Sequence, residues 1–318
     1  MTGAPLAVML RPLGLGDFLS GVPAYRAVAR AFPRHRKVLV APERFAQLAL
    51  LVGGVDEVVG ALPLWPLPEA VQGADLAINL HGRGPQSHEI LLASQPKKIV
   101  AFAHPDIPES KGGAEWRKDE HELQRWCRML THAGIPADPM DFRLHKTEMA
   151  VPRRFRGVTI VHPGAASASR RWPLERWTSV VNALRDRDHD LIVTGNREEV
   201  PLAEELSART GLLHRRCIAG KTSLLGLAAI VSEARMIVCG DTGIAHLASA
   251  YGRPSVVLFG PTSPAEWGPP PAPVHRVLWS GKLGDPHADK PDAGLLEIAV
   301  EQVLSAVEDL DRYTAPAA

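Results

Sequence analysis

Cysteine is scarce in this 318-residue chain, which has only Cys127, Cys217 and Cys239. Three scattered thiols argue against a disulfide framework and favour a reducing compartment. Long apolar runs are missing too, because no stretch approaches the roughly 18 to 20 apolar residues that span a membrane. The opening residues, MTGAPLAVMLRP, run into a strand-like stretch without the basic start of a signal peptide. We therefore expect a cytoplasmic protein without a membrane span, and leave peripheral membrane contact open.

An excess of either charge is also missing, since 36 Lys and Arg stand against 35 Asp and Glu. This balance gives no general attraction to nucleic acid, so we expect no nucleic-acid partner. The 13 histidines form neither an H-E-x-x-H motif nor a zinc spacing with the cysteines. The segment DRDHD at 186–190 resembles a DxD metal motif, but it precedes a strand and so lies at the wrong edge of a sheet. We expect no required metal, and the oligomeric state stays open.

What the chain does have is a regular alternation of short apolar runs with stretches of helical periodicity. Strands that alternate with helices predict βα units and parallel sheets. The expected elements include helices at 19–31 and 295–310 and a strand near 213–218. A stretch near 138–156, rich in proline and basic residues, separates two such series. The sequence therefore predicts an α/β protein with two Rossmann-like doubly wound domains, residues 1–150 and 151–295, facing an interdomain cleft. Residues 296–318 are expected to form a helix and tail that pack back on the domains.

The first motif, RPLGLGDFLSGVP, lies between the first strand and the first helix. A dinucleotide fingerprint needs a third glycine, and Leu19 stands at that position, so we do not expect NAD. Asp17 has two interpretations here. It is either a helix N-cap or a carboxylate at the carboxyl end of the first strand.

The second motif, VHPGAASASRRWP, follows a strand with a loop of small residues and then two arginines. Small residues such as Gly164 let backbone N–H groups approach an anion, and Arg170 adds a cation beside the following helix N-terminus. This arrangement favours a phosphate site. A solvated basic loop is the alternative.

The third motif, GDTGIAHLASAYG, reads as a strand, a tight turn and a helix. Backbone N–H groups of Thr242 and Gly243 at the helix start are suited to hold a diphosphate. In the alternative interpretation Asp241 only caps the helix and His246 belongs to the core. The segment GKTS at 220–223 is not a Walker A loop, because Arg215 replaces the required glycine.

Together these three motifs resemble glycosyltransferase family 9, the heptosyltransferase-like enzymes with the two-domain GT-B fold. The matching segments are LGDFLSGVPAYRAVARAFP, HPGAASASRRWP and DTGIAHLASAYGRPSVVLFGPTSPAEWGP, in the family's order and spacing. The resemblance implies an inverting, metal-independent glycosyltransferase. It would move a heptose-type sugar from a nucleotide donor, commonly ADP-heptose, to an acceptor hydroxyl, with no cofactor.

The resemblance also implies roles for individual residues. Asp17 matches the family's proposed general base, which takes the proton of the acceptor hydroxyl. The residues expected at the donor's diphosphate and sugar are Gly164, Arg170, Asp241, Thr242, Gly243 and His246. Those expected at the nucleotide are Glu198, Thr222 and Ser223.

The acceptor stays open, because no basic amphipathic helix marks a membrane face and a soluble acceptor stands beside a lipid-linked one. Two other functions also stay open. One is a GT-B-like sugar-nucleotide epimerase or hydrolase, and the other is a non-catalytic nucleotide-sugar binding module.

Overall fold

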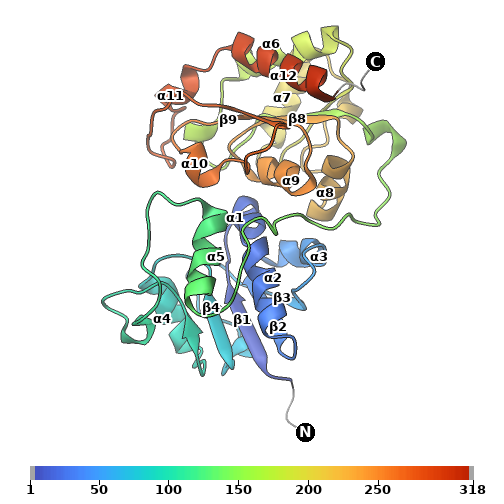
Figure 1. The fold of residues 1–318 in the computed structure, drawn as a ribbon. Coiled ribbons are helices and arrows are strands. Elements are labelled where there is room, and N and C mark those ends of the chain that lie inside the picture. The colour runs from blue at the N-terminus through green and yellow to red at the C-terminus, as the bar shows by residue number, and fades with distance from the viewer. Residues whose placement is uncertain (1–3, 315–318) are drawn as a thin grey trace. The chain divides into compact units, whose positions relative to one another are not determined.

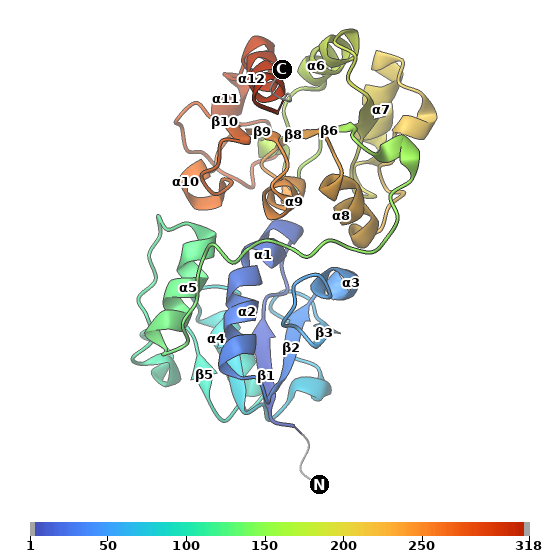
Figure 2. The same cartoon turned by 45° about the vertical axis from the view of Figure 1, so that its right-hand side comes forward.

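The chain folds into two compact units that divide between His145 and Lys146. The computed structural model describes residues 4–314. Each unit is built on one five-stranded parallel sheet with helices packed against it (Figures 1 and 2). These are the parallel α/β units that the alternating pattern predicts.

The sheet of the first unit has the strand order β3-β2-β1-β4-β5, with every neighbouring pair parallel. Its central strands are mostly apolar and buried on both faces, as parallel sheets require. The strand order reverses between β1 and β4, so the loops after these two strands open at the same edge. The strands are β1 (Leu6–Leu10), β2 (Arg36–Ala41), β3 (Glu57–Gly60), β4 (Leu76–Asn79) and β5 (Ile99–Val100).

In the first unit, α2 and α5 lie side by side and α4 packs on β4 (Figure 1). One helix was expected at 19–31, but the structure has two, with Gly21 between them. Pro23 lies in the first turn of α2 and has no N–H to donate, so the helix of α1 cannot continue through it. The helices are α1 (Leu15–Ser20), α2 (Val22–Ala31), α3 (Ala46–Ala49), α4 (Gln86–Ala93) and α5 (Glu122–His132).

The sheet of the second unit has the order β10-β9-β8-β6-β7, again with all pairs parallel. The prediction of a strand near 213–218 is wrong. A 3₁₀-helix occupies His214–Arg216, and only Cys217 forms a single bridge to Val193. Three consecutive basic side chains cannot enter a strand that is buried on both faces. The strands are β6 (Thr159–His162), β7 (Leu191–Val193), β8 (Met236–Gly240), β9 (Ser255–Leu258) and β10 (His275–Leu278).

Helices cover both faces of this second sheet. One layer contains α6, α7 and α12, and the other contains α8 and α9 (Figure 2). Apolar side chains of α6, α7, α12 and the strands form one buried cluster around Trp177. The helices are α6 (Leu174–Asp186), α7 (Val200–Thr210), α8 (Leu224–Ser232), α9 (Gly243–Tyr251), α10 (Pro264–Trp267), α11 (Ala293–Leu296) and α12 (Val300–Thr314).

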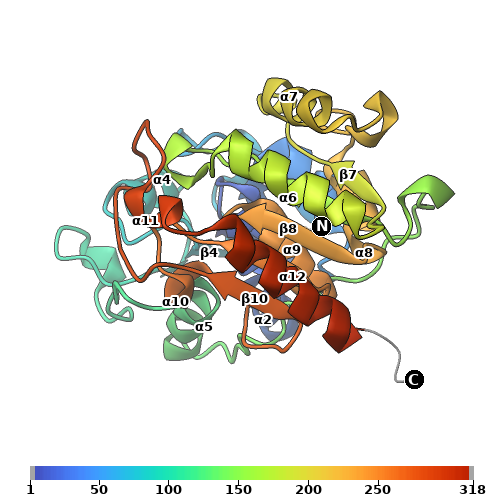
Figure 3. The ribbon, with the colours of Figure 1, turned by 90° about the horizontal axis from the view of Figure 1, so that it is seen from above.

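The single helix predicted at 295–310 is interrupted, and α11 and α12 take its place. Asp292 caps α11 by accepting from two N–H groups of its first turn, and α11 ends at Leu296. A new helix start follows, where the Ala299 N–H donates to the side chain of Gln302. Figure 3 shows α12 beside α6 over the sheet, where it also packs on β9 and β10. Residues 315–318 of the predicted tail lie outside the described residues.

Candidate functional site

The second and third sequence motifs meet at the edge of the second sheet where the strand order reverses. The loop after β6 carries Arg170, and the loop after β8 carries Asp241. Arg170 Nη1 lies 3.7 Å from the Asp241 carboxylate and 3.5 Å from its carbonyl oxygen. A Cβ at Gly240 would lie 3.2 Å from the Arg170 carbonyl, so glycine allows this approach. Crevices at such reversals are where open α/β sheets bind their ligands.

Asp241 is not the cap of α9, as one interpretation of the sequence had it. The N-cap is Thr242, whose backbone is extended and whose side chain makes no capping hydrogen bond. The Asp241 carboxylate is nearly buried and accepts from Thr262 Oγ1 at 2.7 Å. Thr262 follows β9 and was not singled out from the sequence. Asp241 therefore holds the turn in place from two sides, through Arg170 and Thr262.

The start of α9 is a site that favours anions. Gly243 is its first residue, and the Ala245 N–H is already satisfied by the Thr242 carbonyl at 3.0 Å. The other N–H groups of a first helical turn have no acceptor within the helix, and the helix dipole adds partial positive charge there. Thr242 and Gly243 are only half-buried. The turn can therefore present N–H donors to a ligand oxygen.

His246 lies one turn further along α9 and is half-buried. Its ring stands edge-on to Trp267, with centroids 6.2 Å apart and planes at 88°. It is not enclosed in the core, so the core interpretation of this histidine is wrong.

Arg170 ends a short 3₁₀-helix, η5 (Ala168–Arg170), and its side chain is 23% exposed. Its Nε is buried and has no hydrogen-bond partner among residues 4–314. An unpaired buried donor costs free energy unless a ligand or water satisfies it. The guanidinium therefore has capacity left for a bound anion beside its contact with Asp241.

Gly164 lies directly against a carboxylate from another loop. A Cβ at this position would lie 2.3 Å from the carboxyl carbon of Glu199, so the glycine makes room for that carboxylate. Glu199 is nearly buried, and its Oε2 accepts from the Asn196 N–H at 2.8 Å. The same oxygen lies 3.5 Å from His162 Nε2. Burial lowers the pKa of His162, although the nearby Glu199 opposes this shift.

The three residues expected at the nucleotide lie on neighbouring loops. The Gly220 N–H donates to the Gly195 carbonyl at 2.9 Å and joins the loop after β7 to the loop before α8. Ser223 is the N-cap of α8, where its hydroxyl accepts from the Gly226 N–H at 3.1 Å, and Thr222 beside it is half-buried. Glu198 is exposed, in contrast to the adjacent Glu199.

Asp17 lies at the corresponding edge of the first sheet, where β1 and β4 meet. It is the third residue of α1 and not its N-cap, which is Gly14. Its Oδ2 accepts from the Gly14 N–H at 3.2 Å, and its side chain is 28% exposed. Oδ1 lies 3.5 Å from Nη2 of the fully buried Arg11. The carboxylate is therefore held in place and still accessible.

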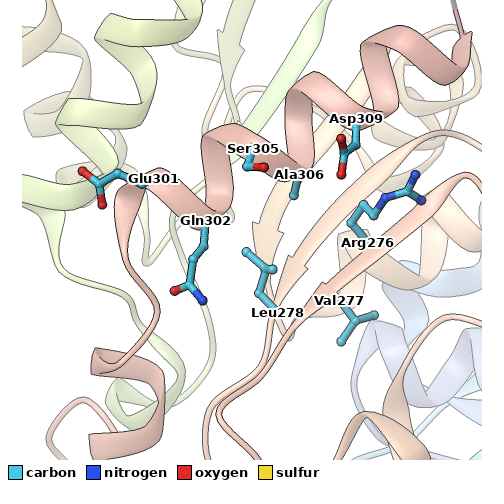
Figure 4. A pocket seen from close by; sticks show the side chains of 8 residues that line it. All are labelled: Arg276, Val277, Leu278, Glu301, Gln302, Ser305, Ala306 and Asp309. Atoms are coloured by element: carbon cyan, nitrogen blue, oxygen red, sulfur yellow. The ribbon is translucent and has the colours of Figure 1, made fainter.

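A cavity of about 450 Å³ lies elsewhere, between β10 and α12 (Figure 4). None of the residues expected from the sequence line it. Figure 4 shows the mixed side chains around it, including Arg276, Glu301 and Asp309. It sits at the free edge of the sheet and away from the strand reversal, so we assign no chemistry to it.

Two further properties concern the described residues only. No group of three or more His, Cys, Asp or Glu side chains in residues 4–314 is arranged to hold a metal ion. Within the same range, every helix is too short or too polar to cross a bilayer.

Comparison with known proteins gives a consistent result. A model of glycosyltransferase family 9 (heptosyltransferase) matches residues 113–293. Lipopolysaccharide heptosyltransferase 1 of Escherichia coli K12 is 30% identical over 295 residues, which cover 81% of this chain and 88% of that protein. Lipooligosaccharide heptosyltransferase 2 of Haemophilus influenzae is 28% identical over 158 residues, and the chain spans only 45% of that relative's length.

Solved structures agree in fold. The structure of E. coli ADP-heptose lps heptosyltransferase II superposes with a TM-score of 0.74 at 18% identity, covering 98% of this chain and all of that one. The iron-containing dodecameric glycosyltransferase TibC of enterotoxigenic E. coli H10407 gives 0.62 at 14% identity, with 99% and 78% covered. At these identities the likeness shows the fold alone, two parallel-sheet α/β domains of the GT-B type.

Proposed function

The chain belongs to glycosyltransferase family 9, the heptosyltransferase family, and from this premise we propose that it transfers a heptose from ADP-heptose to a hydroxyl of a saccharide acceptor. The observation that carries the proposal is the meeting of Arg170 with the Asp241 turn at the start of α9. Cations and helix N–H donors at a strand reversal are suited to a diphosphate. ADP-heptose is the donor named for one relative of the same fold.

The proposed reaction is a single displacement at the anomeric carbon. The acceptor oxygen forms the new C–O bond while Asp17 takes its proton. The bond from the anomeric carbon to the diphosphate oxygen breaks, and its electron pair leaves with ADP. Negative charge grows on the departing diphosphate, which is where fixed donors stabilise the transition state most.

The donor's diphosphate would bind to groups of the second unit. Arg170 supplies a charged donor whose Nε is otherwise unpaired. The N–H groups of Thr242 and Gly243 and the imidazole of His246 supply the rest. Asp241 serves mainly to position Arg170 and the turn, since its carboxylate is occupied by Thr262.

The acidic residue at the nucleotide is, in our proposal, Glu199 and not the exposed Glu198. Glu199 is held by the Asn196 N–H and lies against Gly164. Gly164 follows β6, the strand that leads to the loop with Arg170. A buried carboxylate fixed in this way is suited to accept hydrogen bonds from ribose hydroxyls. We also propose that Thr222 and Ser223 contact the nucleobase of the donor.

We propose that the transfer needs no metal, and that the second substrate is a saccharide. TibC, a relative in fold, is described as iron-containing, so metal independence has to be measured for this chain. We propose a lipid-linked saccharide as the acceptor, since two of the related proteins are named for lipopolysaccharide and lipooligosaccharide. A soluble saccharide is the alternative.

The test is a thermal-shift series with ADP, UDP and GDP, repeated in EDTA. We expect ADP to stabilise the protein, by about 2.7 kcal/mol at a concentration one hundred times Kd, and EDTA to leave this effect and heptose transfer intact. Transfer is measured as ADP release from ADP-heptose with heptose-free lipopolysaccharide or a soluble saccharide as acceptor. A shift with UDP or GDP but not ADP contradicts the donor. Loss of transfer in EDTA, restored by added metal, contradicts metal independence.

A further inference from the structure

Arg11 is a fully buried cation that touches two carboxylates. Its Nη2 lies 3.5 Å from Asp17 Oδ1 and 3.2 Å from Glu122 Oε2. Asp17 is partly exposed, whereas Glu122 is nearly buried. Glu122 comes from the start of α5, far from Asp17 in the sequence. One guanidinium thus joins the accessible carboxylate to an inaccessible one.

The remaining donors of Arg11 are also used. Its Nε donates to the Asp17 backbone carbonyl at 2.5 Å, and Nη1 donates to the carbonyl of Leu80. Nη2 donates to Ser20 Oγ at 2.9 Å as well, and the guanidinium lies 4.7 Å from the ring centre of Trp126. Contacts to α1, to the end of β4 and to α5 leave Arg11 a single position. Because it holds the Asp17 backbone, it also sets where that carboxylate lies.

Glu122 is held from its other side. Its Oε1 accepts from Arg125 Nη1, and its Oε2 accepts from Trp126 Nε1 at 2.8 Å. The side chains form a row of alternating charge, Asp17, Arg11, Glu122 and Arg125. This row is neutral in sum, as buried charges require.

The row matters when Asp17 takes a proton. Arg11 then loses one counter-charge but keeps Glu122 at 3.2 Å, so no isolated buried cation remains. Because Arg11 also pairs with Glu122, it attracts the Asp17 carboxylate, 3.5 Å away, less strongly. Without Glu122, Asp17 would be the only carboxylate beside the guanidinium, and Arg11 would have no counter-charge once Asp17 took the proton.

We propose that Arg11 and Glu122 are positioning residues for Asp17: Arg11 fixes the carboxylate, and Glu122 balances the charge of Arg11 so that Asp17 stays able to accept the acceptor's proton. This rests on the proposed role of Asp17 as general base. The other titratable groups that face Asp17 and Arg11 are Tyr25 of α2 and His81 after β4.

The experiment compares Glu122→Gln with Glu120→Gln as matched control. Glu120 lies just before the same helix and forms an ion pair with Arg128 at 2.6 Å, without contact to Arg11. Both variants lose one carboxylate charge. Both kcat and the KM for ADP-heptose are measured above pH 7 as ADP release from ADP-heptose with heptose-free lipopolysaccharide, and Asp17→Asn is the reference.

In Glu122→Gln we expect kcat to fall several-fold, because proton transfer to Asp17 then leaves Arg11 without a carboxylate counter-charge. The KM for ADP-heptose should stay unchanged. Glu120→Gln should keep the wild-type kcat. Asp17→Asn should lose roughly 10²- to 10⁴-fold in kcat, the usual size of a general-base contribution. Glu122→Asp, which restores the charge, should return kcat toward the wild-type value.

A wild-type kcat in folded Glu122→Gln, or an equal fall of kcat in Glu120→Gln, overturns the proposal. If Glu122→Gln does not fold, as judged by near-ultraviolet circular dichroism, Arg11→Lys serves instead. This variant keeps the charge but loses the planar fork, so we expect at least about a tenfold fall in kcat without a change in donor KM. Normal kcat in Arg11→Lys also overturns the proposal. A wild-type enzyme that releases no ADP contradicts the proposed function and not this inference.

Discussion

Two adjacent glutamates differ in their surroundings although they are neighbours in the sequence. Glu198 and Glu199 follow the same strand and have the same chemistry, but one is exposed and the other is enclosed by Gly164 and Asn196. The motif TGNREE does not distinguish them, because the direction of each side chain depends on where α7 begins. Sequence reasoning chose Glu198, and our proposal for the nucleotide moves to Glu199.

Substitution of each glutamate by glutamine tests this choice. Glu199→Gln should weaken ADP binding about tenfold, since a neutral amide is a weaker acceptor for hydroxyls than a carboxylate. Glu198→Gln is the matched control and should bind ADP like the wild type. Isothermal titration with ADP measures both. Weaker binding in Glu198→Gln alone would return the role to Glu198, and equal affinities in the two variants would contradict a specific role of Glu199.

At the scale of elements, the site depends on two loops that follow neighbouring strands. Strand ends were predictable here, because apolar runs ending in Gly, Asp or His are plain in the sequence, and carboxyl ends of parallel strands share an edge. In the structure Arg170 and Asp241 lie together at this edge, and their binding to the diphosphate stays a proposal. Contacts that reach across the fold were not predictable. Arg11 and Thr262 lie within the quoted motifs and Glu122 outside them, but nothing in these segments names their partners, which are determined only when the helices and loops pack.

Arg170 joins these two loops, and its removal should affect ligand binding more than folding. Arg170→Ala loses a charge-assisted contact worth about 1.5 to 3 kcal/mol, so ADP affinity should fall about 10- to 100-fold. The side chain is 23% exposed and Asp241 keeps Thr262, so we expect only a small loss of thermal stability. Titration with ADP and a melting curve provide both measurements. Unchanged ADP affinity would indicate that the loop with Arg170 is only a solvated basic loop.

At the scale of the whole molecule, buried and half-buried histidines link stability to pH. Burial is the main cause that lowers the pKa of four of them below the ordinary value: His81, His88, His162 and His189. His88 illustrates the reason, since it lies between the Asn79 amide and the Phe102 carbonyl and is suited to the neutral form. Protonation would direct a second N–H at the Asn79 donor.

The direction of this pH effect on stability follows from the number of protons that the folded and unfolded states bind. Below about pH 6.5 the unfolded chain protonates its histidines while these four resist, so the unfolded state binds more protons and is favoured as pH falls. Stability should therefore be complete above about pH 7 and decline between pH 6.5 and 5. Carboxylates with lowered pKa, such as Asp75 and Asp141, lose their contribution only at more acidic pH. Melting temperatures at fixed ionic strength measure this, and a constant value from pH 8 to 5 would contradict it.

The space beside Gly164 has a consequence for how such sequences change over generations. The volume that a methyl group would take at position 164 is already filled by the carboxylate of Glu199. A lineage that acquires alanine at 164 must move or shorten the acid at 199, and one that loses the acid no longer has a reason to retain glycine. We expect the two positions to vary as a pair, so that one inherited change predicts the other.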